Sequence, residues 1–305
     1  MKTTISCLTA ALLLLGCKKD YHPMPPQPDP ARPKQWVVST FAGNGTKAVA
    51  DGSAMTASFF FPEAVAVTPD NTFLVTDVGS HRIRKITSGL VSTLAGNDSF
   101  GIVDDLGPLA QFKSPFQITI DGNGNIFTSD DNDNRIRKIT PAGQVSTYAT
   151  MPHNGSYILA DQQGNLYISE PYDNRIRKLA PNGALTTIAG PDAHLSYPGS
   201  IIRDKDGNLF VADRLNNRIR KITPDGVISN FAGSGTSGSA DGDAASAQFS
   251  PDMNGMVFDS KGNIFLGHLF AIRKITPQGN VSTIAGSDNL GFADGPGATA
   301  RFGLP

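Results

Sequence analysis

Between Trp36 and Pro305, apolar and polar residues alternate in short runs, and no helical period of 3.6 continues over ten residues. The best example contains four successive runs: FQITID, IFTSD, RIRKIT and QVSTYA, within residues 116–149. Each run has the length of a short β-strand, and turn-forming residues separate it from the next. The pattern predicts four consecutive antiparallel strands and an all-β fold.

The turns between these strands have the chemistry of tight hairpins. The first turn ends in Gly124-Asn125, and the third is Pro141-Ala142-Gly143. Glycine and asparagine tolerate positive φ, and proline presets the first central torsion of a turn. Both turns recur in later parts of the chain, which indicates that the four-strand unit is repeated.

The heptapeptide NRIRKIT at 134–140 marks the period of the repeat. Close copies begin at His81, Asn174 and Asn217, and a shortened copy contains Ile272. The first isoleucines of the five copies lie 53, 40, 43 and 53 residues apart. The shortest spacings match a four-stranded propeller blade of about 40 to 45 residues.

This third strand should contact neighbours on both faces. Ile136 and Ile139 are separated by an odd number of residues and therefore point to opposite sides of the sheet. We expect the basic side chains between them to lay their methylenes along the packing surface and to carry their charges to water.

A carboxylate lies five residues before the first arginine of the motif in four of the five units. The pairs are Asp77 and Arg82, Asp130 and Arg135, Glu170 and Arg175, and Asp213 and Arg218. We expect each pair to bond across the turn between the second and third strands. The fifth unit, Gly267 to Ile272, is two residues shorter and lacks the pair, so its turn must be stabilised differently.

The repeat D-x-x-G-N-[IL]-[FY]-x-x-D-x-x-x-N-R-I-R-K-I-T-P-x-G-x-V-S-T-x-A-G resembles the NHL repeat, and the likeness covers residues 36–305. That family consists of β-propellers, often with six blades. The resemblance therefore implies an NHL-type β-propeller.

The strand count is uneven. The outer strand V-S-T-x-A-G occurs six times and the three inner strands only five times, and the surplus copy is the first, at 37–43. The tail at 300–305 matches 57–62 and 110–115, which precede a first strand. We expect five complete four-stranded blades plus the N-terminal outer strand of a sixth blade. The inner strands of that blade, about 25 residues, would be missing from this chain, which is then truncated at its C-terminus.

The first 35 residues differ in composition. Residues 1–16 read as a signal peptide, and Leu14-Leu15-Gly16-Cys17 resembles a bacterial lipobox in which Cys17 is acylated. Residues 17–35 form a proline-rich tether that favours an extended polyproline II conformation. The alternative is an ordinary exported leader with an incidental cysteine. Residues 36–305 form the propeller domain.

The cysteine count and the leader together predict location. Cys7 and Cys17 are the only cysteines, so cleavage before Cys17 leaves no disulfide partner. We expect an exported protein that is lipid-anchored in the cell envelope, at the outer membrane. Lys18, Lys19 and Asp20 loosely resemble an export tag of surface lipoproteins in the Bacteroidetes, which suggests the cell surface.

The basic heptapeptide does not predict nucleic-acid binding. The five copies hold 14 of the 26 Lys and Arg residues, so the positive charge is distributed around the ring. The formal net charge is −1, whereas backbone-driven binding of nucleic acid requires a basic patch on the domain. We expect no nucleic-acid partner.

One face of the propeller should carry the function. The turns between second and third strands share this face with the connectors between blades, whose varied loops favour binding. The connectors at 150–156 and 190–199 are short and predict a notch beside Tyr157, Tyr172 and Tyr197. These rings could stack on a sugar or bind a peptide.

Metal binding is the alternative for this face. His153 and His194 occupy equivalent connectors of adjacent blades, and lyases related to the family use metal or histidines on such a face. No H-x-x-x-H motif or carboxylate dyad supports them. Asp51, Asp104, Asp241 and Asp294 occupy the long connectors, but without the D-x-D-x-D spacing of a calcium site, so we expect them to order the loops.

The sequence thus favours a lipid-anchored envelope protein without a cofactor that presents a propeller face to an extracellular protein, peptide or glycan. We expect binding or scaffolding rather than catalysis, since no nucleophile elbow, P-loop or dinucleotide motif is present. The second hypothesis is a lyase or lactonase that depends on a divalent metal and uses the histidine-bearing face.

Overall fold

The computed structural model describes residues 35–153, 155–287 and 289–303. The expected signal peptide, the acylated Cys17 and all of the tether except its last residue lie outside these residues. In the part of the chain that the structure describes, no helix is long and apolar enough to span a membrane.

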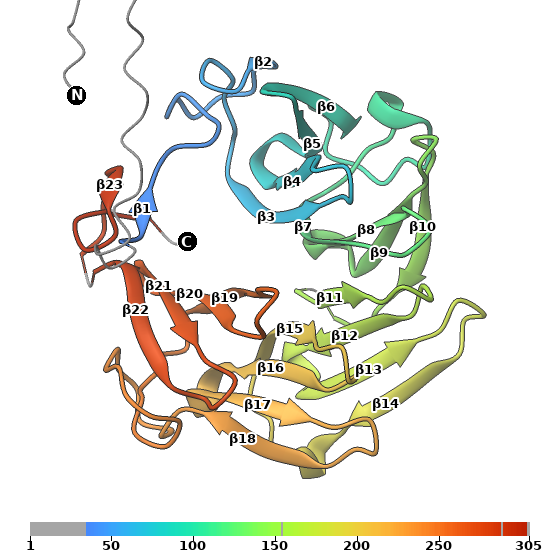
Figure 1. Cartoon of the computed structure of the whole chain (residues 1–305). Coiled ribbons are helices and arrows are strands. Elements are labelled where there is room, and N and C mark those ends of the chain that lie inside the picture. The colour runs from blue at the N-terminus through green and yellow to red at the C-terminus, as the bar shows by residue number, and fades with distance from the viewer. Residues whose placement is uncertain (1–34, 154, 288, 304–305) are drawn as a thin grey trace, which may run out of the picture. The chain divides into compact units, whose positions relative to one another are not determined.

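Residues from Trp36 onward form one compact unit that contains five antiparallel sheets of the expected kind (Figure 1). Blade one consists of β3 (Pro62–Val67), β4 (Phe73–Asp77), β5 (Arg82–Thr87) and β6 (Leu90–Gly96), with β2 (Gly52–Ser53) added to its outer edge. Blade two consists of β7 (Pro115–Ile120), β8 (Ile126–Asp130), β9 (Arg135–Ile139) and β10 (Val145–Thr150). Blade three consists of β11 (Tyr157–Ala160), β12 (Leu166–Glu170), β13 (Arg175–Leu179) and β14 (Leu185–Ala189). Blade four consists of β15 (Pro198–Arg203), β16 (Leu209–Asp213), β17 (Arg218–Ile222) and β18 (Ile228–Ala232). Blade five consists of β19 (Met253–Phe258), β20 (Ile264–His268), β21 (Ala271–Ile275) and β22 (Val281–Gly286).

The blades stand around a common axis with the first strand of each innermost (Figure 1). Neighbouring inner strands contact each other in the order β3, β7, β11, β15 and β19. Hydrophobic clusters fill the spaces between blades: Ile139 packs with Leu74 of blade one, whereas Ile136 packs with Ile158 of blade three. The prediction of an all-β propeller with two-sided third strands is confirmed.

An aspartate closes the first hairpin in blades two to five, and in blade one the Thr68 hydroxyl takes its place by accepting the Thr72 backbone N–H at 3.0 Å. The Asp121 carboxylate accepts the backbone N–H groups of Asn123 and Asn125 at 2.9 and 2.8 Å and also the Asn125 side-chain amide. Gly124 has a φ of 77°, which a residue with a Cβ adopts only at a cost. Local chemistry therefore determines this turn, as the sequence predicts.

A single 3-10 turn joins the second and third strands in four blades. These turns are η1 (Val78–Ser80), η3 (Asp131–Asp133), η4 (Pro171–Asp173) and η6 (Arg214–Asn216). Each ends in a left-handed residue, which is the first residue of the heptapeptide: His81, Asn134, Asn174 or Asn217. Their side chains bond the next connector, for example Asn134 to the Pro152 carbonyl at 3.3 Å. Two further 3-10 turns, η2 (Gly107–Leu109) and η5 (Pro191–Ala193), lie in connectors.

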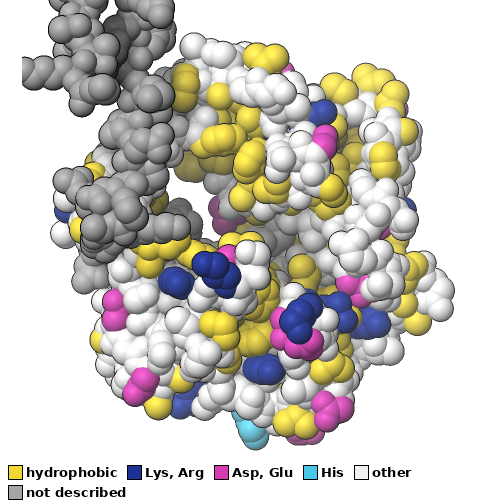
Figure 2. Space-filling model, viewed as in Figure 1, with side chains coloured by type: hydrophobic (Ala, Val, Ile, Leu, Met, Phe, Trp, Pro, Cys, Tyr) yellow, Lys and Arg dark blue, Asp and Glu magenta, His cyan; other side chains and the backbone are white. Residues whose placement is uncertain are grey.

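The two ends of the described unit meet in a separate strand pair. β1 (Val37–Val38) pairs with β23 (Gly295–Pro296) between blade five and blade one (Figure 1). A cavity of about 410 Å³, lined mainly by apolar residues of this pair and of blade one, lies beside it. Figure 2 shows a hollow on this side of the ring, with hydrophobic side chains along its blade-one edge.

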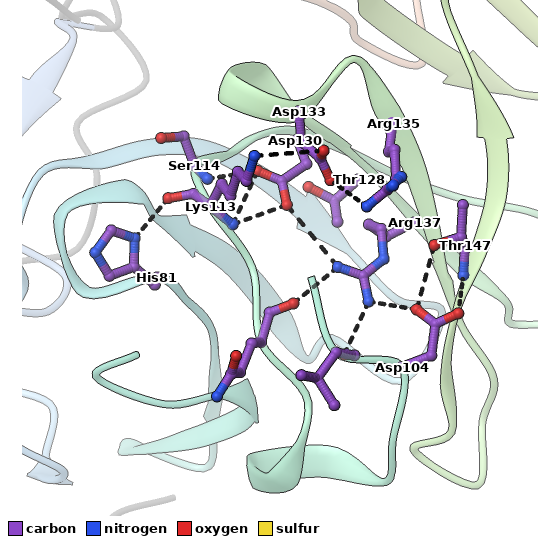
Figure 3. Close-up of polar contacts among 12 residues, drawn as sticks. His81, Asp104, Lys113, Ser114, Thr128, Asp130, Asp133, Arg135, Arg137 and Thr147 are labelled. Carbon is purple, nitrogen blue, oxygen red and sulfur yellow. Dashed lines mark hydrogen bonds and ion pairs between the residues drawn. The ribbon is translucent and has the colours of Figure 1, made fainter. Parts of the chain in front are cut away.

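The arginine network of the third strands is shown for blade two in Figure 3. Asp130 lies opposite Arg135 in the register, yet Arg135 pairs with Asp133, its Nη1 2.9 Å from the carboxylate. Asp130 pairs instead with Arg137, whose Nη1 is 3.9 Å away, and accepts the backbone N–H groups of Lys113 and Ser114. The predicted partner is therefore wrong.

The other blades confirm this correction. Asp77 pairs with Arg84, Glu170 with Arg177 and Asp213 with Arg220, and not with Arg82, Arg175 or Arg218. The second arginine follows the first by two residues, so both point to the same face of the sheet. From there the second arginine reaches the carboxylate at the end of the second strand, which the connector covers. The first arginine lies at the turn and extends to the surface, as Arg82 does toward Asp98.

In blades one, two and five the second arginine is also more buried than the sequence predicts. The side chains of Arg84 and Arg137 have no solvent exposure, and that of Arg273 has almost none. Each guanidinium contacts a connector aspartate: Arg84 Nη2 lies 2.6 Å from Asp51, and Arg273 Nη2 lies 2.9 Å from Asp241. These groups do not reach water, because the connector covers them.

The connector aspartates act over long sequence separations. In blade two, Asp104 receives Arg137 Nη2 at 2.6 Å and the Thr147 backbone N–H at 2.9 Å, which joins the connector to the third and fourth strands. The expectation that these aspartates order the loops is correct, but their partners lie about one blade away in sequence.

Blade five replaces the missing pair with a histidine. His268 is buried at the position of the carboxylate, and its Nε2 accepts the Ser250 backbone N–H at 2.8 Å, as Asp213 accepts that of Ser196 at 2.7 Å. Arg273 Nη1 lies 3.4 Å from the other ring nitrogen. The shortened turn is thus stabilised by an imidazole.

Candidate functional site

Tyr172 and Tyr197 meet where blade three approaches blade four. Tyr172 lies in η4, and Tyr197 ends the connector before β15. Their ring centroids are 5.5 Å apart with planes at 83°. A hydrogen bond with the Tyr172 hydroxyl raises the pKa of Tyr197 to about 12, so its hydroxyl stays protonated at physiological pH.

The backbone at Tyr197 is held in a costly conformation. Its φ is 53°, and it precedes Pro198, which disfavours helical torsions at the residue before it. A non-glycine residue in the left-handed region stores about 1 kcal/mol or more, and such strain concentrates at functional sites. The Asn174 side chain accepts the Tyr197 backbone N–H at 2.8 Å and fixes the ring opposite Tyr172.

Arg214 connects the third predicted tyrosine to this pair. Tyr157 is buried at the start of β11, with its ring 5.4 Å from that of Phe116. Its hydroxyl lies 3.3 Å from Arg214 Nη1, and the Arg214 guanidinium lies 5.6 Å from the centre of the Tyr197 ring. The Pro251 carbonyl accepts Arg214 Nε at 2.7 Å and orients the guanidinium. Arg214 therefore joins Tyr157 to Tyr197, and Tyr197 contacts Tyr172.

Two carboxyl groups lie near the inner end of this cluster. Desolvation raises the pKa of Glu63 and of Asp131, and the charge of Asp131 raises that of Glu63 further. Both carboxyl groups also act electrostatically on Tyr157, whose pKa is raised mainly by burial. Carboxyl groups with raised pKa values that lie on the same face as exposed aromatic rings are typical of a binding site.

We call Tyr157, Tyr172, Tyr197, Arg214 and His153 the tyrosine cluster. Tyr172 is the most accessible member, with 61% of its surface exposed, and His153 lies beside it with ring centroids 6.0 Å apart. The cluster offers an exposed aromatic surface, a guanidinium and protonated hydroxyl groups. It can stack on a ring or a sugar and hydrogen-bond to carbonyl or hydroxyl oxygens.

The two histidines of the alternative hypothesis make different contacts. His153 Nδ1 lies 3.1 Å from the Asp173 carboxylate. His194 ends η5 in the left-handed conformation, and its carbonyl accepts the Asn216 side-chain amide at 2.9 Å. Across the described residues, no three His, Cys, Asp or Glu side chains are arranged to hold a metal ion.

Two cavities that are open to solvent lie elsewhere. A cavity of about 550 Å³ is lined by Phe210, Lys221 and Phe258 between blades four and five, on the side of the tight hairpins. The 410 Å³ cavity lies beside β1. The tyrosine cluster lies in neither cavity, and its exposed Tyr172 ring suits an extended ligand at the surface better than an enclosed small molecule.

One member of the cluster, Arg214, and two residues near it, Glu63 and Asp131, were not singled out from the sequence. Asp131 and Arg214 directly follow the second strand in their blades, where the other blades have Val78, Pro171 and Leu269. The sequence feature that could have identified Asp131 and Arg214 is that the residue after the second strand varies between blades, although the repeat around it is regular. Such variation marks positions that the fold leaves free.

Comparison with known families supports the repeat assignment. Residues 105–242 match the Virginiamycin B lyase family, and residues 59–86 match the NHL repeat. No protein of curated function matches the chain significantly in sequence.

Solved structures share the fold over most of the chain. A structural-genomics protein of unknown function from Bacteroides thetaiotaomicron has 22% identity and a TM-score of 0.70, with 88% of this chain and 68% of that chain covered. An auxiliary nutrient binding protein from Bacteroides ovatus has 17% identity and a TM-score of 0.69, with coverages of 88% and 70%. Virginiamycin B lyase from Staphylococcus aureus has 21% identity and a TM-score of 0.53, with coverages of 73% and 69%. At these identities the likeness establishes the fold alone.

Proposed function

We propose that this NHL-repeat β-propeller is an envelope binding protein that presents the tyrosine cluster to an extracellular peptide, protein or glycan. The observation that carries the proposal is the arrangement of Tyr172 and Tyr197, one exposed and the other held in a strained backbone by Asn174. Rigid aromatic side chains lose little conformational entropy on binding, so they make effective contact surfaces.

The two ends of the tyrosine cluster carry different charged groups. Arg214 lies on the blade-four side of the cluster, whereas Glu63 and Asp131 lie on the side of blades one and two. A ligand that spans the cluster meets a positive group at one end and carboxyl groups at the other. This arrangement suits a polymer with polar groups along its length, such as a peptide backbone or a glycan.

The proposal includes export and lipid anchoring at Cys17, which rest on the leader sequence. The description of structural neighbours from Bacteroides as auxiliary nutrient binding proteins is consistent with a binding role in the envelope. A Bacteroides-like surface protein with an aromatic binding face would retain a nutrient polymer near the cell.

A second candidate function is metal-dependent elimination or lactone hydrolysis, because residues 105–242 match the Virginiamycin B lyase family. In this candidate His153 would act with Asp173, which lies 3.1 Å away. Stoichiometric metal in the purified protein that is lost in both His153→Ala and His194→Ala would favour it over binding alone.

The test of the binding function is affinity measurement on immobilised glycans and envelope peptides with matched variants. Tyr172→Ala should lose about tenfold or more in affinity for the captured ligand, since a contact of about 1.4 kcal/mol corresponds to that factor. Phe100→Ala is the control, because Phe100 has a similar exposed fraction, 59%, and lies outside the cluster. Unchanged affinity in the Tyr172 variant would show that the cluster is not the binding site.

A further inference from the structure

The pair β1 and β23 has the contacts of a blade's outer edge. Gly295 pairs with Val38 as Gly52 pairs with Val91 and Gly242 with Val281. Asp294 accepts the Thr40 backbone N–H at 2.8 Å, as Asp51 accepts that of Thr93 at 3.1 Å. β1 therefore has the contacts of an outer strand, and the segment from Ala293 to Phe302 lies against it as a connector does in the other blades. We call this segment the sixth connector.

The sixth connector also reproduces the site that holds a buried arginine in three other blades. In blade one the Arg84 guanidinium bonds the carbonyls of Ala50 and Ser58 and the Asp51 carboxylate, and lies 5.1 Å from the centre of the Phe59 ring. The residues at the same spacing in the sixth connector are Ala293, Arg301, Asp294 and Phe302. We call these four residues the arginine cradle.

The cradle is built but holds no guanidinium from the third strand of a blade. Ala293 and Arg301 bond each other through both backbone groups, at 3.0 and 3.1 Å, as Ala50 and Ser58 do in blade one. Within the described residues, no ion pair involves the Asp294 carboxylate, and the Arg301 guanidinium bonds the carbonyls of Thr299 and Ala300. Asp294, Arg301 and Phe302 line the 410 Å³ cavity.

A gap separates blade five from blade one. Apolar side chains on both sides of it occupy repeat positions that are buried in other blades, but here they are exposed. Val65 of blade one is 60% exposed, whereas its counterparts Ile118 and Ile201 are 7% and 4% exposed. Val257 of blade five is 60% exposed, whereas its counterpart Ile202 is 7% exposed. The same repeat positions are covered by a neighbouring blade elsewhere and uncovered here.

A glycine at the end of the outer strand gives an independent observation. A Cβ on Gly96 would lie 2.3 Å from the His81 carbonyl, and one on Gly286 would lie 2.3 Å from the Phe270 carbonyl. Glycine is needed there because the turn between second and third strands packs against it. A Cβ on Gly43, at the same place in β1's repeat, would meet only the Phe59 ring at 3.5 and 3.8 Å.

We propose that the gap between blade five and blade one binds a three-stranded antiparallel β-segment with this chain's own inner-strand pattern. Its third strand pairs with β1, and an arginine of that strand enters the arginine cradle at the place that Arg84, Arg137 and Arg273 occupy in their blades. Its aliphatic residues cover Val65 and Val257. The first hairpin of the segment packs at the axis between β19 and β3.

The charge and shape of the site select this occupant over a non-specific apolar ligand. The carboxylate and two carbonyl oxygens of the cradle accept hydrogen bonds in the fork geometry of a guanidinium. The uncovered backbone edge of β1 adds main-chain pairing, which is the usual way that a sheet edge binds an extra strand. A lipid or a small apolar molecule would use neither feature.

The test is a fusion of the full chain to a copy of residues 116–140, placed directly after Pro305. The repeat puts Pro305 at the position of Pro115, so the copied strands enter in register. We expect the midpoint of thermal unfolding to rise by about 5 °C or more. Trp36, the only tryptophan, lies beside the gap with its ring 5.7 Å from that of Phe265, and its emission should shift to shorter wavelength as it is covered.

The matched control is the same fusion with the arginine copied from Arg137 changed to alanine. It retains all apolar residues, so it should keep part of the Trp36 shift but lose at least half of the thermal gain. A synthetic peptide of residues 115–140, titrated against the unfused chain, gives a second measurement that does not depend on the fusion. Equal unfolding midpoints and emission for the chain and both fusions, without a response to the peptide, would overturn the proposal. A stable dimer of the unfused chain with Trp36 already covered would also overturn it.

Discussion

Two arginines in one strand, Arg135 and Arg137, show how position within the repeat changes the role of a residue. Arg137 is fully buried, bonds two carbonyls and Asp104, and lies over the Phe112 ring at 5.0 Å. Arg135 lies at the turn, is 27% exposed and bonds Asp133. The strand uses one guanidinium to fix the connector and the other at the surface.

We predict that Arg137→Ala destabilises the protein by about 3 to 5 kcal/mol, because it leaves Asp130 and several carbonyls buried without their partner. Arg135→Ala, two residues away in the same strand, should cost about 1 kcal/mol or less. Urea unfolding followed by circular dichroism measures both. Similar losses in the two variants would contradict the distinction.

The partner of each buried arginine could not be obtained from sequence alone. The register correctly places Asp130 opposite Arg135, and a pair across the turn follows from it. The actual pairing with Arg137 depends on the connector, which buries the carboxylate and turns it inward. The connector pattern placed Tyr157 at a notch, but it is buried, with Phe116 of the neighbouring inner strand and Arg214 beside it, and such contacts between blades have no local signal in the sequence.

At the scale of elements, the sequence predicts the strands and hairpins well because their signals are local. The Asp-x-x-Gly-Asn and Pro-x-Gly turns fix where strands begin and end, and the NHL resemblance is confirmed by the match at 59–86. The asparagine of NRIRKIT is also explained by local structure, since it ends the 3-10 turn in the left-handed conformation. Its contact with the following connector is not local and appears only in the fold.

Asn174 links such a turn to the tyrosine cluster. We predict that Asn174→Gly keeps the left-handed turn but releases the Tyr197 backbone, and that it costs about 1 kcal/mol for the lost hydrogen bond. Asn174→Ala should cost about 1 kcal/mol more, because alanine adopts this conformation poorly. Thermal unfolding of the two variants checks the order.

Ligand affinity of the Asn174 variants shows whether this residue supports the binding site or only the fold. Both Asn174 variants should weaken the ligand contact of the cluster, since Tyr197 is no longer held opposite Tyr172. Asn134→Gly is the control in blade two, where the side chain bonds Pro152 instead. Equal binding by all three variants would show that the Asn174 contact serves the turn alone.

At the scale of the whole molecule, the burial of the inner strands varies around the ring. β11 and β15 have blades on both sides, whereas β3 and β19 border the gap and contain the exposed Val65 and Val257. Local stability falls where apolar contacts are few.

We predict that backbone amides of β3 and β19 that bond their second strands exchange with deuterium at least about tenfold faster than the equivalent amides of β15. Hydrogen exchange read by mass spectrometry on peptides from these strands measures the difference. Uniform protection around the ring would mean that the gap does not weaken the neighbouring blades.

In blades one and two, a connector aspartate binds the buried arginine and a threonine of the outer strand, and this has a consequence for how such a protein gains or loses blades. Asp51, Arg84 and Thr93 all fall within one stretch that runs from a connector to the outer strand that it covers, and Asp104, Arg137 and Thr147 repeat this order. A gene segment copied or deleted between these boundaries carries each buried cation together with its own counter-charge. Blade number can therefore change during evolution by whole segments without leaving an unneutralised arginine in the interior.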